Sequence, residues 1–347
     1  MCKIFKFTHQ LFIFMLLVSN SVSVLAQETL HILAWPGYAD ADLVQTFEER
    51  YKVKVEVTLI DSDDTMWKRM TAGEDVKFDV FAVNTAQLQR YIDVGISIPL
   101  TLSNIPNTKK QLPRFRNRAE IPGLIRNGYE YAIPYTYSEM GLIYDRKVFP
   151  IPPDSFALMW DKRFQGRVLM YENSEHNFSL AALTLGLKNP FHIPDTDFNR
   201  LSGYLVELRR NVRTYYEKPE EATTLFMQNN IALLFANYGS QQLTLLQDAG
   251  ADIGYVIPKE GALAWLDCWS VTRFSKNVDL AESWINYTLE AQVSQALTLR
   301  QGLPNTLQDP PTLNKADKII WLQQVENSLK RKLLWDKIMS GETLSEF

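Results

Sequence analysis

The chain of 347 residues is 46% hydrophobic, 12% aromatic and 22% charged. This composition is typical of a globular protein and excludes disordered, collagen-like and coiled-coil chains. Because a single hydrophobic core stops growing at roughly 250–300 residues, the length favours two lobes. The formal charge of −4 leaves no basic excess to neutralise a phosphate backbone, so nucleic acid is not an expected partner.

Residues 1–26 have the pattern of a secretory signal peptide. Lys3 and Lys6 are followed by an apolar run, Leu11–Val18, and by small residues that end at Ala26. The alternative of an uncleaved anchor is weaker, because polar residues interrupt the apolar stretch. Cleavage would leave Cys268 as the one cysteine, so the exported chain could form no intramolecular disulfide.

The first half of the exported chain alternates strand and helix patterns. Short apolar, β-branched or aromatic runs predict strands, and longer amphipathic segments predict helices. The predicted strands are Leu30–Trp35, Val53–Leu59, Asp79–Val83, Glu130–Pro134 and Gly141–Tyr144, with helices at Asp40–Tyr51 and Asp64–Thr71. This alternation indicates a parallel or mixed sheet covered by helices.

A second α/β series follows the proline-rich connection Phe149–Pro153. The predicted strands are Arg167–Tyr171, Ala232–Ala236, Ile253–Ile257 and Ala264–Thr272. The predicted helices are Phe178–Leu187, Asp197–Asn211, Gln241–Ala249, Asp279–Leu289, Gln292–Arg300 and Trp321–Ser340. The second lobe is therefore expected to have the same fold class as the first.

Two segments carry candidate binding residues. Ligands of open α/β sheets bind beyond the carboxyl ends of strands, where Trp35 and Tyr38 follow the first strand. These rings suit a binding wall, although they could also pack over their own lobe. Trp265 and Asp267 lie two apart on a predicted strand and so share a face. An aromatic ring beside a carboxylate favours an organic ammonium ligand.

Standard enzyme and metal signatures are absent from the sequence. It contains no G-x-S-x-G, H-E-x-x-H, G-x-x-x-x-G-K-[ST] or C-x-x-C motif. Cys268 points to the face opposite Asp267 and is expected to be a small buried side chain rather than a nucleophile. We therefore expect no enzyme, no cofactor and no metal. The adjacent Tyr215 and Tyr216 leave open a ferric-ion site of the kind found in periplasmic iron-binding proteins.

Seven segments resemble the periplasmic spermidine/putrescine-binding proteins, the substrate-binding subunits of polyamine ABC importers. The similarity extends over nearly the whole exported chain and depends on the order and spacing of the segments together. They are Leu30–Tyr38, Asp63–Trp67, Phe78–Val80, Ile133–Tyr135, Trp160–Gly166, Met227–Ser240 and Pro258–Asp267. The resemblance implies a two-lobed α/β periplasmic binding protein fold of type II, with hinge strands between the lobes.

By position, the resemblance implies roles for four residues. Trp35 and Tyr38 would be aromatic walls of the first lobe, Trp265 would be a ring of the second lobe, and Asp267 would bind an ammonium. The sequence departs from the family at Asn84 and Asn237, which stand where small or aromatic residues are expected and so remove aromatic surface.

A further departure concerns acids. The acids expected after the first strand of the second lobe align with Asn173 and His176, although Glu172 and Glu175 are one residue away from each. Glu139, beyond the hinge segment, could supply a replacement anion. For Glu139, Glu172 and Glu175 the alternative is a solvated carboxylate. The expected polyamine-binding residues are Trp35, Tyr38, Asn84, Glu139, Glu175, Asn237, Trp265 and Asp267.

These expectations together describe a periplasmic binding protein. The first lobe would comprise residues 27–138 completed by about 267–302, and the second 139–266 completed by about 303–347. The chain would be a monomer that captures spermidine, norspermidine or putrescine between its lobes and delivers it to an ABC permease. An alternative from the same resemblance is a polyamine sensor that docks on the periplasmic domain of a membrane-bound cyclic-di-GMP enzyme and controls biofilm formation.

Overall fold

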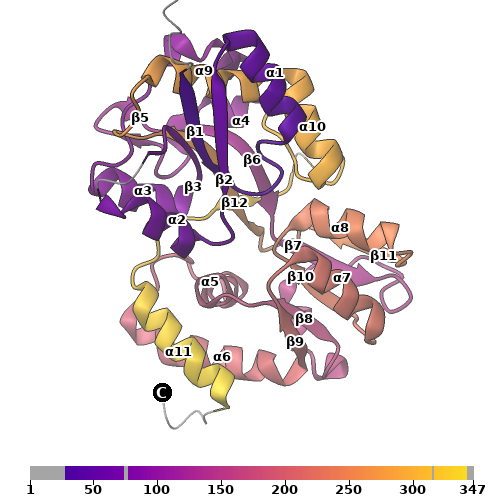
Figure 1. Cartoon of the computed structure of the whole chain (residues 1–347). Helices are drawn as coiled ribbons and strands as arrows, with labels where there is room; N and C mark the ends of the chain where they lie inside the picture. The colour runs from indigo at the N-terminus through magenta and orange to yellow at the C-terminus, as the bar shows by residue number, and fades with distance from the viewer. Residues whose placement is uncertain (1–27, 74–76, 315, 342–347) are drawn as a thin grey trace, which may run out of the picture.

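The computed structural model describes residues 28–73, 77–314 and 316–341. The predicted signal peptide lies outside these ranges. Within them, no helix combines the length and the apolar character needed to cross a membrane. The predicted alternation of helices and strands is confirmed, and the strands form two large sheets that lie one above the other in Figure 1.

The first sheet has the strand order β13-β12-β3-β1-β2, and β6 also pairs with β12. Its strands are β1 (Thr29–Ala34), β2 (Lys54–Leu59), β3 (Val80–Asn84), β6 (Ile133–Glu139), β12 (Ala262–Val271) and β13 (Ile319–Trp321). β1 runs parallel to β2 and β3, whereas β12 is antiparallel to β3 and β6. The carboxyl ends of β1, β2 and β3 therefore share one edge.

The second sheet has the order β11-β7-β10-β8-β9. Its strands are β7 (Gly141–Asp145), β8 (Val168–Tyr171), β9 (Val212–Tyr216), β10 (Leu233–Ala236) and β11 (Ile253–Val256). β8 runs parallel to β9 and β10, and β7 is antiparallel to β10 and β11. Here too, three parallel strands end at a common edge.

Helices cover both faces of each sheet, because alternate side chains of the strands are buried on opposite faces. On the first sheet, α1 (Ala41–Tyr51), α9 (Val278–Thr288) and α10 (Ala291–Gln301) pack against one face, and α2 (Asp63–Met70) and α3 (Thr85–Asp93) against the other. On the second, α5 (Ser174–Thr184), α6 (Phe198–Asn211) and α11 (Ser328–Ser340) oppose α7 (Pro219–Gln228) and α8 (Gly239–Asp248).

Short polar side chains start several of these helices directly after a strand or turn. Ser62, Asn84 and Asn173 each accept a hydrogen bond from a backbone N–H in the first turn of α2, α3 and α5, respectively. Such caps satisfy backbone groups that have no partner within the helix. They also fix polar residues at the edges where the parallel strands end.

The structure differs from the sequence predictions in a few segments. The helix predicted for Trp321–Ser340 begins only at Ser328, where Asn327 caps it, because Ile319–Trp321 pairs with β12 instead. β6 extends to Glu139 because it follows β12 along its length. Strand β9 and helices α3 and α7 were not predicted.

The two sheets are joined where β6 continues through Met140 into β7. Gly239, with φ +46°, lies against this joint, and a Cβ atom there would meet the Ser138 hydroxyl and, at 2.6 Å, the backbone oxygen of Glu139. No side chain fits at this position. β13 falls within residues 303–347, which were predicted to complete the second lobe, yet it pairs with β12 in the first sheet. The other lobe boundaries stay a prediction.

One buried cation fixes the C-terminal helix on the second sheet's side of the molecule. Arg331 of α11 is fully buried and donates to both carboxylate oxygens of Glu326, at 2.8 and 2.7 Å. It also donates to the Ser179 hydroxyl and to the backbone oxygens of Glu175 and Pro190. The Arg331 side chain thereby links helices α5 and α11.

We predict that Arg331→Ala lowers the free energy of unfolding by about 3–5 kcal/mol, because it leaves Glu326 and several acceptors without their donor. Urea denaturation measures the change. Lys332→Ala on the same helix is the control, because Lys332 forms an exposed pair with Asp336 and its loss should cost under about 0.5 kcal/mol. Equal stability of the two variants would contradict this role of Arg331.

Candidate functional site

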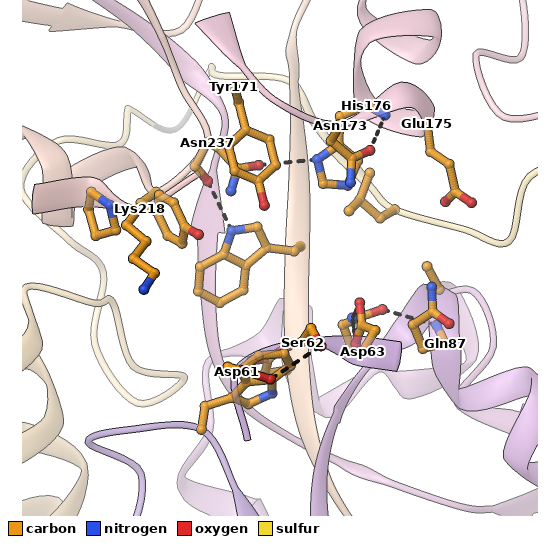
Figure 2. A pocket seen from close by; sticks show the side chains of 18 of the residues that line it. Asp61, Ser62, Asp63, Gln87, Tyr171, Asn173, Glu175, His176, Lys218 and Asn237 are labelled. Carbon is orange, nitrogen blue, oxygen red and sulfur yellow. Dashed lines mark hydrogen bonds between the residues drawn. The ribbon is translucent and has the colours of Figure 1, made fainter. Parts of the chain in front are cut away.

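The carboxyl ends of the parallel strands from both sheets line one cavity of about 750 Å³. From the first sheet come residues that follow β1, β2 and β3, and from the second come residues that follow β8, β9 and β10. In Figure 2, Asp61, Ser62, Asp63 and Gln87 lie on one side of this space, and Tyr171, Asn173, Glu175 and Asn237 on the other. The volume suits a small organic ligand.

The charged groups of the cavity are mostly acidic. Six carboxylates line it: Asp61, Asp63, Asp64, Glu175, Glu220 and Asp267. Among the described lining residues, Lys218 is the single lysine or arginine. Such a lining focuses a negative potential into the cavity and favours a cation.

Asp267 is the most deeply placed of the predicted ligands. It lies on β12, is 7% exposed, and accepts a 2.6 Å hydrogen bond at Oδ2 from the Tyr38 hydroxyl. No described residue donates to its Oδ1. Burial raises the pKa of Asp267 to about 7; the Tyr38 hydrogen bond opposes this rise, and the charge of Asp63 adds to it. The carboxylate therefore gains from any cation that reaches it.

Tyr38 lines the cavity but is not an exposed wall. It is 4% exposed, and its ring packs edge-on against Tyr135 and Trp269, with centroids 5.4 and 6.4 Å away. The ring belongs to the hydrophobic core of the first sheet, which is the alternative to a binding wall given in the sequence analysis. What it presents to the site is the hydroxyl that orients Asp267.

Two tryptophans form half-buried walls of the cavity. The Trp35 indole N–H donates to the backbone oxygen of Ala82 at 3.2 Å. The Trp265 indole N–H donates to the backbone oxygen of Asn237 at 3.0 Å. These bonds fix the planes of both rings. Trp265 packs against the hydrophobic cores of both sheets, so it lies at the boundary between them.

Asn237 and His176 form a neutral polar wall. The Nδ1 atom of His176 lies 3.2 Å from Oδ1 of Asn237, and Tyr171 stacks on the imidazole with centroids 5.7 Å apart. Burial lowers the pKa of His176 to about 4. The imidazole is therefore uncharged at neutral pH and does not repel a cation.

The structure separates the two candidate glutamates that follow β8. Glu175, in the first turn of α5, lines the cavity. Glu172 instead accepts a 2.6 Å hydrogen bond from the Trp335 indole and is not among the lining residues. Asn84, also predicted as a ligand, lines the cavity and donates to the carboxylate of Asp63.

Glu139 is the one predicted ligand that does not line the cavity. It is 1% exposed rather than solvated, and no described residue is hydrogen-bonded to either carboxylate oxygen. Burial raises its pKa to about 7, while Arg114 lowers it and Asp317 raises it. Glu139 is the last residue of β6, where it pairs with Ala264 of β12 just before the chain passes into the second sheet.

The alternative tyrosine site is not assembled in the cavity. Tyr216 is buried and donates to the Phe235 backbone oxygen at 2.6 Å, whereas Tyr215 packs edge-on against Trp335. Within the described part of the chain, no three His, Cys, Asp or Glu side chains are grouped to hold a metal ion. Cys268 is fully buried, as predicted.

Sequence reasoning missed two groups of lining residues. Asp61 and Asp63 follow β2, Tyr171 ends β8, and Tyr238 follows β10. The rule that selected Trp35, position beyond the carboxyl end of a parallel strand, applies equally to all four.

Comparison with known proteins places these observations in a family. Residues 42–318 match the family model described as "Bacterial extracellular solute-binding protein". The chain is 24% identical over 283 residues to the "Spermidine/putrescine-binding periplasmic protein 1" of Haemophilus influenzae, covering 81% of this chain and 76% of that one. It is 27% identical over 296 residues to the "Putrescine-binding periplasmic protein PotF" of Escherichia coli, covering 80% and 78%.

A solved structure shares the fold. The spermidine/putrescine ABC transporter substrate-binding protein PotD from Streptococcus pneumoniae superposes with a TM-score of 0.73 at 20% identity, covering 90% of this chain and 99% of that one. The predicted fold, that of two-lobed periplasmic solute-binding proteins, is confirmed.

We predict that Glu139→Gln stabilises the protein at pH 8 but not at pH 4. The pKa of Glu139 rises on folding from about 4.5 to about 7. The contribution of the protonated side chain to the free energy of unfolding is therefore fully present below pH 4.5 and is lost as the pH rises through 7. The difference in unfolding free energy between variant and wild type should therefore increase by about 3 kcal/mol between these pH values. Urea denaturation across the range measures it, and a constant difference would contradict the prediction.

Proposed function

Since the chain belongs to the bacterial extracellular solute-binding proteins, we propose that it captures a linear polyamine such as spermidine, norspermidine or putrescine between its lobes. Binding takes place in the periplasm, and an ABC permease of the inner membrane receives the ligand. The names of the Haemophilus and Escherichia relatives support this ligand class and location.

The observation that carries the proposal is the pairing of acids with aromatic rings in one cavity. Asp267 lies beside Trp265 on β12, and Trp35 faces the same space from the end of β1. A polyamine alternates ammonium groups with methylene segments. Carboxylates accept the hydrogen bonds of the former, and the ring faces attract the cations and cover the apolar segments.

The roles follow from the contacts of each residue. Tyr38 holds Asp267 toward an ammonium, and the bond from Trp265 to Asn237 sets the ring against the ligand chain. The neutral His176 keeps positive charge away from the second lobe's wall. Closure of the lobes would remove water from these groups and strengthen each electrostatic contact. Nothing in this cycle alters the ligand chemically.

The sensor alternative uses the same binding event with a different partner. Asn173 and His176, where acids are expected in transport proteins of this family, are the observation that favours it. Deleting the gene separates the two roles: loss of polyamine uptake supports transport, and a biofilm change with normal uptake supports signalling through a cyclic-di-GMP enzyme.

We predict that Asp267→Asn weakens spermidine binding by about 1.5–3 kcal/mol, the value of a hydrogen bond to a charged group. Calorimetric titration measures the change. Asp248→Asn is the matched control, because Asp248 is exposed at the end of α8 and is not a lining residue. Wild-type affinity in Asp267→Asn would remove this residue from the site.

We also predict that polyamine affinity rises with pH between 5 and 8. The ligand amines stay protonated in this range, since aliphatic amines have pKa values near 10. The pKa of Asp267 is about 7, so below this value a proton competes with the ammonium for the carboxylate. Titrations at four pH values should give a steeper dependence for wild type than for Asp267→Asn. Parallel pH profiles would contradict this assignment.

A further inference from the structure

Asp63 and Glu175 come from opposite lobes and face the same part of the cavity. Asp63 is the first residue of α2, directly beyond β2, and Glu175 lies in the first turn of α5, beyond β8. Figure 2 shows the two carboxylates on opposite sides of the open space, at the end away from Lys218. Helix N-termini support both, which favours negative charge at each position.

Asp63 is held in place by its neighbours. The Asn84 amide nitrogen donates to its two carboxylate oxygens, at 3.1 and 3.2 Å. The orientation of that amide is fixed because its oxygen accepts the backbone N–H of Gln87 at 3.0 Å. Arg90 donates to the backbone oxygen of Asp63 at 2.9 Å. The carboxylate therefore has a fixed direction in the cavity.

In the part of the chain that the structure describes, no cationic side chain is hydrogen-bonded or ion-paired to either carboxylate. The side-chain bonds to the Asp63 carboxylate come from a neutral amide, and the Arg90 guanidinium lies over the Trp67 ring, 4.5 Å from its centroid. Among the described residues, none is hydrogen-bonded or ion-paired to the Glu175 carboxylate. Burial raises the pKa of Asp63 to about 6; the Arg90 charge and the Asn84 hydrogen bond oppose this rise, and the charge of Glu175 adds to it.

A third carboxylate gives independent evidence of a ligand. Asp267 is more than nine-tenths buried, lines the same cavity, and has no described hydrogen-bond partner at Oδ1. The charge of Asp63 raises its pKa. The Asp63 charge interacts unfavourably with the charges of Glu175 and Asp267, and a bound cation would relieve that repulsion.

We propose that Asp63 and Glu175 form one subsite, completed across the two lobes, that binds a primary ammonium group of the ligand. This inference rests on the proposed function and adds an acid from the first lobe to it. A primary ammonium has three N–H donors, so it can bond to both carboxylates at once. A fully methylated ammonium has none. A bound primary amine would thus connect the lobes, with Asn84 as the positioning residue of Asp63.

A double-mutant cycle tests the subsite. Calorimetric titration with putrescine is carried out on wild type, Asp63→Asn, Glu175→Gln and the double variant. Each single change should weaken binding by about tenfold or more. If both acids hold the same ammonium, the double variant should bind more tightly than the product of the single effects implies. Asp61→Asn with Glu175→Gln is the control pair. Its effects should multiply, because Figure 2 shows Asp61 on the Lys218 side of Asp63, away from Glu175.

A second measurement uses only the wild-type protein. Putrescine is compared with its analogue in which both nitrogens carry three methyl groups. The charges are retained and the donors are lost, so affinity should fall by about tenfold or more. Thermal melting of each variant without ligand checks that it is folded.

The outcomes separate the two proposals. If wild type binds none of putrescine, spermidine or norspermidine, the proposed function fails. If wild type binds putrescine but Asp63→Asn does so equally well, or if the Asp63 and Glu175 effects multiply, the shared subsite alone is overturned. Equal affinity for putrescine and its methylated analogue would also overturn it.

Discussion

The cavity exists because two sets of parallel strands end at facing edges. In each sheet the chain leaves three parallel strands at the same edge, and the next residues cap a helix or turn. Polar side chains at these positions accept hydrogen bonds from the first backbone N–H groups of the helices. Ser62, Asn84 and Asn173 all occupy such positions, and Asp63 follows the first of them. The chemistry of the site is therefore a property of strand ends.

β12 adds the part of the site that strand ends do not supply. It crosses the first sheet antiparallel to β3 and β6, so Asp267 pairs with Asn84 and Trp265 with Ser138. This register brings a buried acid and an indole to the centre of the cavity. The hydrogen bonds from Tyr38 and to Asn237 then fix their directions. The electrostatic cost of burying this acid favours a cation beside it.

The sequence was sufficient for most elements and for the central residues of the site. Alternation along β12 placed Trp265 and Asp267 on one face, and both line the cavity. The sequence was insufficient where the burial or position of a residue depends on strands that are far apart in the chain. Glu139 is buried in a part of the fold where its strand partner, Ala264, is 125 positions away in sequence. Likewise, Asp63 and Glu175 line the same cavity only because the two sheets face each other, and no local pattern contains that information.

The close approach of Gly239 to the joint has a consequence for how such a protein can diversify. Any side chain at this position would collide with the backbone of β6, so the residue is closed to substitution while this joint is kept. Residues at the strand ends have no such restriction, because they project into open space. A lineage could therefore exchange one ligand for another by changing strand-end residues one at a time, with the mechanical connection between the lobes inherited unchanged.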